Sequence, residues 1–397
     1  MTDMTDVIEV VVCAGGAAWE LPLVRAFQRR ELGVRVARRC VDHGELLGTA
    51  LRDRPTAVVL DASLPWLDRD LVTTLRRAGI EAFAIGNSAR LLDRLGVHCL
   101  ALDATPELIA AALYSLESPV PCDPRSAAGV GEAADGTADA GRIVAVWGGA
   151  GSPGRTTVAV HVAIETARAG ARTLLIDGDA WSASVAQLLE LHESPSLAQA
   201  ARLAADGWPS PFDTTVQFGP NGLAVLAGLA RAELWPEVRE IAWRGVLAAA
   251  TTQYDVVVVD LAAPIEEDEE LAYDRVPYRR NLLTRIALER ADDILLVAAA
   301  DPVGLRRAVV AHRNLTEGLP DASRKVRVVL NRAPRAGRRL QECSRSVEEW
   351  MGDVPAALLP EEAALGRVGW EGRPLTEIAP RSRWLRELRS SLAVVRS

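Results

Sequence analysis

The stretch Ile143-Val-Ala-Val-Trp-Gly-Gly-Ala-Gly-Ser-Pro-Gly-Arg-Thr-Thr157 decides how this chain folds. Its apolar beginning, from Ile143 to Trp147, predicts a buried strand that breaks into a turn rich in glycine. After Thr156 the apolar residues recur with helical spacing. The stretch therefore predicts a strand, a loop and a helix in direct succession, which is how an α/β unit begins.

The glycines match the template of a phosphate-binding loop from Gly149 to Gly154, and Arg155 and Thr156 follow where the template has Lys and Ser or Thr. In such a loop, successive backbone N–H groups converge on phosphate oxygens at a helix N-terminus, whose dipole favours negative charge. Only small residues let the backbone come this close, and the hydroxyl can ligate Mg²⁺. The predicted nucleotide-binding residues are Gly149, Gly151, Ser152, Gly154, Arg155, Thr156 and Thr157. The alternative is an ordinary tight turn between a strand and a helix.

Carboxylates follow two further apolar runs. Asp177 and Asp179 come directly after Thr173–Ile176, and Asp260 follows four consecutive valines, Val256–Val259. Side chains two apart in a strand point to the same side, and an all-valine run is typical of a strand buried on both faces. Asp260 then stands where a carboxylate that reaches Mg²⁺ through water belongs. Each of these carboxylates, taken alone, could instead cap a strand end and bind loop amides.

The composition narrows the class of protein. A chain of 397 residues is long enough for two or three domains with buried cores. The formal net charge of −8 argues against general nucleic-acid binding, so DNA is not an expected partner. The five cysteines lack metal-ligand or disulfide spacing, no apolar run reaches the length of a membrane span, and the acidic N-terminus is unlike a signal peptide. We therefore expect a cytoplasmic protein.

Residues 1–116 alternate predicted strands and helices, which indicates a doubly wound parallel sheet of the flavodoxin-like type. The predicted strands are Val7–Val12, Val34–Val36, Ala57–Leu60, Ala82–Ile85 and Cys99–Leu102. The predicted helices are Leu21–Arg29, Gly44–Leu51, Leu71–Ala78, Leu91–Leu95 and Pro106–Leu116.

The order and sizes of these elements resemble a response-regulator receiver domain, with Asp61 at the end of the third strand, where the phosphoacceptor would be. Cys13-Ala14-Gly15 stands where acidic Mg²⁺ ligands should follow the first strand, and Leu102-Asp103 where a lysine should end the fifth. Without the charge of a metal, a phosphoryl group on Asp61 would have little to stabilise its transfer. We therefore expect a degenerate receiver-like domain that serves docking or dimerisation.

Residues 117–141 hold three prolines and then Gly, Ala and Asp without apolar periodicity, which predicts a flexible linker. The alternation resumes over residues 142–397, with about seven mostly parallel strands expected and the ligand at their carboxyl ends. The further strands are predicted at Leu223–Leu226, Ile294–Ala298, Val326–Leu330 and Ala356–Leu359. The helices are predicted at Ser184–Leu191, Leu197–Ala205, Glu237–Ala250, Leu282–Arg290, Leu305–Asn314, Leu340–Met351, Ala363–Val368 and Arg383–Val395.

With this loop, the Asp-x-Asp pair and Asp260 in that order, residues 142–395 resemble the ParA/MinD family of P-loop ATPases. The subgroup they resemble is that of the CpaE/TadZ-like proteins, in which a degenerate receiver-like domain precedes the ATPase. The resemblance implies ATP and Mg²⁺ as ligands and a homodimer formed across the nucleotide. It implies that Asp179 orients the attacking water. The implied Mg²⁺-binding residues, partly through water, are Thr156, Asp177 and Asp260, and the implied adenine contacts are Asn331, Arg332, Pro360 and Glu361. For Asn331-Arg332 the alternative is a plain turn at a strand end.

Two departures from this family affect the loop. The family's signature lysine, which reaches across the dimer to the partner's phosphates, corresponds to Ala150, and Arg155 replaces the phosphate-contacting lysine. Ser152-Pro153 also stiffens the turn and removes one N–H donor. Arginine keeps a permanent charge but is bulkier than lysine. We therefore expect ATP to bind and to be hydrolysed slowly, unless an arginine near the site, such as Arg279 or Arg280, replaces the missing lysine.

Other charged and amphipathic segments leave alternatives open. The run Glu266–Glu270 is typical of a solvated loop, or it is a switch region that meets a basic partner. The arginines at 332, 335, 338 and 339 form a basic patch without the aromatic residues that favour nucleic-acid binding. The last helix either packs its apolar face on its own domain or lies on an anionic membrane, at the cell pole or elsewhere. His161, in the helix after the loop, is expected to be structural.

These patterns together predict a nucleotide-dependent protein that positions or helps to assemble a cell-envelope machine, such as a Tad/Flp pilus. Its expected partners are a second copy of the chain and proteins of pilus assembly, secretion or division. The step from fold to pilus rests on family analogy alone. The alternatives are a septum-site or chromosome-partitioning regulator, and a nucleotide-binding pseudo-ATPase scaffold.

Overall fold

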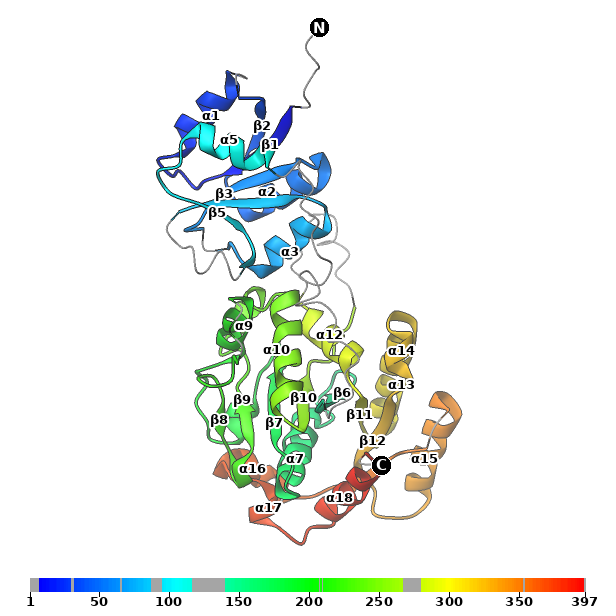
Figure 1. Cartoon of the computed structure of the whole chain (residues 1–397). Helices are drawn as coiled ribbons and strands as arrows, with labels where there is room; N and C mark the ends of the chain where they lie inside the picture. The colour runs from blue at the N-terminus through cyan, green and yellow to red at the C-terminus, as the bar shows by residue number, and fades with distance from the viewer. Residues whose placement is uncertain are drawn as a thin grey trace. The chain divides into compact units, whose positions relative to one another are not determined.

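Figure 1 shows the computed structural model of the chain. It describes residues 7–29, 32–64, 66–86, 95–115, 140–206, 208, 210–266, 280–352 and 354–395. The chain forms two compact units, one mainly within residues 1–138 and one mainly from residue 139 onward. The predicted linker at 117–141 and the predicted helix at Leu91–Leu95 fall almost entirely outside the described residues.

The first unit is a parallel sheet with the strand order β2-β1-β3-β4-β5. Its elements are β1 (Ile8–Cys13), α1 (Glu20–Gln28), β2 (Val34–Arg39), α2 (His43–Asp53), β3 (Ala57–Asp61), α3 (Arg69–Arg77), β4 (Glu81–Ile85), β5 (His98–Leu100) and α5 (Pro106–Tyr114). Val11 and Cys13 of β1 belong to a core with α2 and α3, whereas Val10 and Val12 belong to a second core with α1 and α5. Alternate side chains of β1 are therefore buried on opposite faces, as a doubly wound sheet requires. The likeness of this unit to a receiver domain stays a prediction.

The second unit is a sheet with the strand order β13-β12-β11-β6-β10-β7-β9-β8. Its strands are β6 (Arg142–Trp147), β7 (Thr173–Gly178), β8 (Gln217–Phe218), β9 (Ala224–Leu226), β10 (Val256–Leu261), β11 (Asp293–Ala299), β12 (Val326–Ala333) and β13 (Ala357–Pro360). The described strand pairings are parallel except that of β8 with β9. The mostly parallel sheet is confirmed, and the short edge strand β8 is an addition to the prediction.

The helices of this unit are α7 (Arg155–Arg168), α8 (Val185–Leu188), α9 (Leu197–Ala205), α10 (Glu240–Gln253), α12 (Leu282–Arg290), α13 (Pro302–Gly318), α14 (Pro320–Ser323), α15 (Arg338–Met351), α16 (Leu365–Glu371), α17 (Leu375–Ile378) and α18 (Arg383–Val395). Several predicted bounds differ from the structure by a few residues, and for two helices the reason is local. Helix α8 ends early, and Glu190 just beyond it has a left-handed φ of 53°, which no α-helix contains. Helix α13 begins early, because the Asp301 side chain accepts hydrogen bonds from its first backbone N–H groups and Pro302 fits the first turn.

The apolar face of α18 is buried in the same core as α7. Trp384, Leu385 and Leu388 are almost fully buried in this core. The Arg389 guanidinium also donates two hydrogen bonds of 2.8 Å each to the Glu165 carboxylate of α7. Of the two alternatives for this helix, packing on its own domain is confirmed, so that this face is not available to a membrane surface. In the described part of the chain, no helix combines the length and the apolar character needed to cross a membrane.

Candidate functional site

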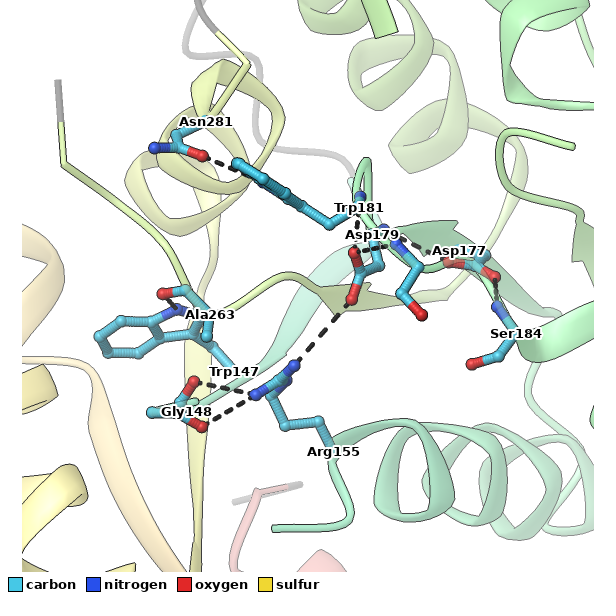
Figure 2. Close-up of polar contacts among 11 residues, drawn as sticks. Trp147, Gly148, Arg155, Asp177, Asp179, Trp181, Ser184, Ala263 and Asn281 are labelled. Carbon is cyan, nitrogen blue, oxygen red and sulfur yellow. Dashed lines mark hydrogen bonds and ion pairs between the residues drawn. The ribbon is translucent and has the colours of Figure 1, made fainter. Parts of the chain in front are cut away.

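The carboxyl ends of the central strands bring the predicted loop and carboxylates to one edge of the sheet. Figure 2 shows Arg155, Asp179 and Asp177 of this site. Strand β10 lies between β6 and β7. Asp260 of β10 is in register with Val146, just before the loop, and with Asp177 of β7. Parallel strands end at the same edge, so that the loop, Asp177 and Asp260 lie side by side as the sequence predicts.

The loop itself runs through three residues with a positive φ, namely Gly151 at 103°, Ser152 at 54° and Gly154 at 97°. A Cβ on Gly154 would lie 2.4 Å from the Asn331 amide nitrogen, so no other residue fits there. Ser152 has no such freedom, and its conformation costs of the order of 1 kcal/mol or more. The loop is therefore a strained turn that leads directly into α7.

Arg155, the first residue of α7, folds back over the loop. Its Nη1 donates to the Gly148 oxygen at 3.2 Å and to the Gly149 oxygen at 2.9 Å, and its Nη2 lies 4.0 Å from Asp179 Oδ2 (Figure 2). The guanidinium thus links the beginning of the loop to the carboxylate after β7. One edge of this cation is occupied by loop carbonyls.

Asp179 is held by the chain that follows it. Its Oδ1 accepts hydrogen bonds from the backbone N–H groups of Trp181 at 2.8 Å and of Ser182 at 2.9 Å. Its Oδ2 points toward Arg155 (Figure 2). One carboxylate oxygen is therefore fixed by backbone donors, while the other faces Arg155 at the start of α7. That Asp179 orients the attacking water stays a prediction.

Asp177 has three backbone donors. Oδ2 accepts from the N–H groups of Ser184 at 2.8 Å and Val185 at 2.9 Å, and Oδ1 accepts from Asp179 N at 3.3 Å. Burial raises the pKa of this carboxyl to about 6, and the three N–H groups act in the opposite direction. These contacts make Asp177 the anchor of the chain between β7 and α8. Its contact with Mg²⁺ stays a prediction.

Asp260 lacks such donors. The residue is 1 % exposed, and neither carboxylate oxygen has a hydrogen-bond partner. Burial, and after it the charge of Asp177, raises the pKa of Asp260 well above its usual value, while the nearby Thr156 hydroxyl and Arg155 lower it. A buried carboxylate without donors is costly unless a cation offsets it.

Mg²⁺ fits these residues. It takes oxygen ligands and in proteins is often held by one or two carboxylates, nucleotide phosphates and water. Thr156 and Asp260 would hold it here, and it would supply positive charge to the phosphates. The described residues contain no cluster of three or more His, Cys, Asp or Glu side chains that could bind a metal by themselves, so the phosphates would have to complete the coordination.

Asn331 reaches the loop from β12, which lies two strands from β6 in the sheet. Its Nδ2 donates to the Pro153 oxygen at 2.9 Å, and its Oδ1 accepts from Trp384 Nε1 at 3.1 Å. Both ends of this buried amide therefore hold the chain together. The predicted contact of Asn331 with adenine stays a prediction, while its position beside the loop is a finding.

The other residues predicted to touch adenine lie at the ends of β12 and β13. Arg332 has a φ of 55°, and its Nη2 lies 3.4 Å from the Ser152 oxygen. Pro360 ends β13 opposite Ala333, and Glu361 beyond it is exposed. The structure therefore brings Arg332 to the loop and places Pro360-Glu361 one strand further out.

Two residues near the loop were missed by the sequence analysis. Trp384 of α18 fixes Asn331, as described above, and Arg307 of α13 lies against Gly151, where a Cβ would meet its Nη1 at 1.8 Å. No local pattern identifies either, because distant helices deliver them. Of the arginines proposed to replace the signature lysine, Arg280 lies instead over the Trp181 ring, with Cζ 3.5 Å from the ring centroid. Arg279 and residues 267–270 of the acidic run lie outside the described residues.

Asp61, in the first unit, is enclosed by donors. Trp19 Nε1 donates to its Oδ2 at 2.8 Å, and both the backbone N–H and the hydroxyl of Ser63 donate to Oδ1. Burial alone would raise the pKa of Asp61, but the hydrogen bonds from Ser63 and Trp19 hold it below its usual value. Cys13 and Ala14, in the place of acidic ligands, are buried and bring no charge. The absence of phosphoryl transfer at Asp61 stays a prediction.

No family model matches the chain. Two solved structures are similar to it over this α/β architecture. The MinD cell division ATPase of Pyrococcus furiosus gives a TM-score of 0.52 at 20 % identity, with 64 % of this chain and 98 % of that chain covered. A ParA family ATPase from Chlorobium tepidum TLS gives a TM-score of 0.54 at 19 % identity, with 63 % and 98 % covered. The chain has the fold of the MinD and ParA ATPases over this share of its length.

Two further relatives carry names that describe their ligand or role. The septum site-determining protein MinD of Pyrococcus horikoshii OT3, complexed with Mg-ADP, gives a TM-score of 0.51 at 19 % identity and covers 64 % of this chain and 95 % of its own. The antiactivator FleN of Pseudomonas aeruginosa is 25 % identical over 252 residues, which are 61 % of this chain and 81 % of FleN.

Proposed function

We propose that this protein is a CpaE/TadZ-like member of the ParA/MinD family that binds ATP with Mg²⁺ at the loop between β6 and α7. The observation that carries the proposal is Asp260, whose buried and unpartnered carboxylate stands beside the Thr156 hydroxyl. A cation bound with the phosphates would give Asp260 the positive charge that the described chain supplies only through Arg155. The Mg-ADP of one MinD relative supports the same ligand.

Isothermal titration calorimetry with ATP and Mg²⁺ tests this proposal. Arg155→Ala and Thr156→Ala are each expected to weaken binding at least tenfold, or about 1.4 kcal/mol. Thr252→Ala is the matched control, because this exposed threonine on α10 uses its hydroxyl only within its own helix. Wild-type affinity in both loop variants would remove the proposal.

We further propose that the bound nucleotide lets the protein position or help to assemble a cell-envelope machine, most specifically a Tad/Flp-type pilus, from the cytoplasm. A homodimer across the nucleotide is the expected active form. The names of the relatives, which include a cell division ATPase and a septum site-determining protein, support a positioning role without specifying the machine. Neighbouring genes for a secretion ATPase and pilins would support the pilus, whereas division or chromosome-partitioning genes would support the septum-site or partitioning alternative.

A second candidate function is that of a nucleotide-binding scaffold without turnover. The observation in its favour is Arg155, whose Nη1 is tied to two loop carbonyls instead of pointing freely toward a ligand. The similarity to an antiactivator is compatible with a regulator that acts by binding. Single-turnover assays with radiolabelled ATP separate the two candidates, because a scaffold binds ATP and releases it unchanged.

A further inference from the structure

Arg307 lies along the outer side of the phosphate loop. A Cβ on Gly149 would lie 3.0 Å from the Arg307 backbone oxygen and 3.1 Å from its Cβ. A Cβ on Gly151 would lie 1.8 Å from Arg307 Nη1 and 2.8 Å from Cζ. The backbone of Arg307 therefore abuts the first part of the loop, and its guanidinium abuts the second. Glycine at both positions is what permits this approach, because any side chain at 151 would displace the guanidinium.

The charge of Arg307 is not used within the described chain. Its side chain is exposed, and among the described residues it has neither an ion pair nor a hydrogen bond. Arg313 on the same helix serves for comparison, because its Nε lies 3.9 Å from Glu317 Oε1. A guanidinium without a counter-ion, held against a loop built to bind phosphate, is a cation placed for an anionic ligand.

Arg307 also lines two hollows beside the loop. One, of about 260 Å³, contains Arg307 with Ala150 and Glu266. The other, of about 120 Å³, contains Arg307 with Ala150, Gly151 and Arg332. Ala150 and Arg307 thus line both hollows together, so a cation is present where residue 150 itself offers none.

We propose that Arg307 is a second phosphate-binding cation of this site, supplied by α13 of the same chain that binds the nucleotide. The inference rests on the proposed binding of ATP and adds to it the residue that recognises the outer phosphates. Arg155 approaches the loop from α7 on the Asp179 side, and Arg307 approaches it from α13 on the Ala150 side. Because a planar guanidinium can bind two phosphate oxygens at once, Arg307 would favour the nucleotide with more phosphate charge.

The test compares the full-length wild type with Arg307→Gln, Arg307→Lys and the control Arg313→Gln. Calorimetry gives the affinities for ADP and for the non-hydrolysable analogue AMPPNP, both with Mg²⁺, and thermal unfolding checks each fold. Arg307→Gln should weaken the binding of AMPPNP at least tenfold and the binding of ADP by no more than about threefold. Arg307→Lys should recover part of the loss, and Arg313→Gln should bind both nucleotides as the wild type does.

The ratio of the two affinities separates phosphate recognition from a structural role, because a structural role would weaken the binding of both nucleotides equally. An unchanged ratio in Arg307→Gln would overturn the inference and leave the proposed function standing, provided that the wild type binds nucleotide. Failure of the wild type to bind ADP or AMPPNP would overturn both. Because the Arg307 side chain is exposed, Arg307→Gln and Arg307→Lys are both expected to unfold at the temperature of the wild type.

Discussion

Asp260 lies in register with Asp177 on the neighbouring strand, and both carboxylates are buried. Asp177 accepts hydrogen bonds from three backbone N–H groups, whereas neither oxygen of Asp260 has a partner. Burial raises the pKa of both carboxyls, and the charge of Asp177 raises that of Asp260 further. At neutral pH this pair opposes folding, and a bound cation would relieve the conflict.

Asp260→Asn is therefore expected to stabilise the nucleotide-free protein. A raised folded-state pKa means that the folded state binds more protons than the unfolded state, so the stability present at acid pH is lost as pH rises through the raised pKa. An amide carries no charge, so the stability of Asp260→Asn relative to the wild type should increase with pH. Urea unfolding at pH 5 and pH 8 measures it.

The control for this variant is Asp255→Asn. Asp255 is exposed and pairs with Arg172, and that contact lowers its pKa. Its replacement should not stabilise the protein at either pH. If Asp260→Asn proves less stable than the wild type at pH 8, the charge conflict at the strand pair is not as described.

Asn331→Ala should loosen the loop and destabilise the fold together. It leaves the Pro153 oxygen and Trp384 Nε1 without their described partners, which costs about 1–3 kcal/mol. We expect urea unfolding to show this loss and calorimetry to show weaker nucleotide binding at a temperature where the variant is folded. Gln341→Ala, which removes an exposed amide of α15, serves as the control. Full nucleotide affinity in Asn331→Ala would mean that the loop does not depend on this amide.

The extent to which sequence predicts this site follows from how far apart the contacting residues are. The loop and the carboxylates after β7 and β10 are predictable, because each follows an apolar run and parallel strands end together. The bond from Asn331 to the Pro153 oxygen joins residues 178 apart, and no local pattern encodes such a contact. Arg307 was missed for the same reason, since helical spacing says nothing about which helix borders a loop.

The same reasoning applies to the fold. Helix α12 was predicted to the residue, and β10 was predicted from its first residue but two residues too short, because one strong pattern decides each of them. The two-residue strand β8 carries too little pattern to be seen, and it exists only because β9 offers it an edge. The early end of α8 depends on the left-handed φ of Glu190, a conformation that its residue type does not predict.

His161 is expected to make the protein sensitive to acid. Its Nε2 accepts from Leu375 N at 3.0 Å, so Nδ1 carries the proton and donates to the Thr157 oxygen at 2.7 Å. Burial lowers its pKa to about 4, so the stability from neutral His161 is present above the usual value of 6.5 and is lost as pH falls toward 4. His161→Gln should flatten the dependence of unfolding free energy on pH in this window, and should cost about 1–3 kcal/mol at pH 7. An unchanged slope between pH 6.5 and 4 would contradict this role.

Asp61 is not expected to accept a phosphoryl group. Its oxygens already accept hydrogen bonds from Trp19 and Ser63, and Cys13 stands where a metal-binding carboxylate would be needed. Incubation with acetyl phosphate or beryllofluoride and Mg²⁺ should leave the intact mass unchanged. Robust modification that disappears in Asp61→Asn would show a working receiver domain.

The last prediction concerns turnover, which should be far below the 1–10³ s⁻¹ typical of enzymes. In phosphoryl transfer, negative charge spreads over the phosphoryl oxygens, and catalysis comes mainly from cations and donors placed around them. The chain keeps Asp179, with one oxygen free of backbone donors, but Arg155 is tied to the loop carbonyls and Ala150 brings no charge.

Ala150→Lys is therefore expected to raise the hydrolysis rate at least severalfold, whereas Asp179→Ala should abolish the residual rate without removing ATP binding. The lysine would add a cation in the two hollows that Ala150 shares with Arg307, and Asp179→Ala would remove the carboxylate that faces Arg155 across 4.0 Å. A phosphate-release assay on purified protein measures both rates. Wild-type turnover near 1 s⁻¹ without a partner would show that the two arginines already suffice, and the missing lysine would then explain nothing.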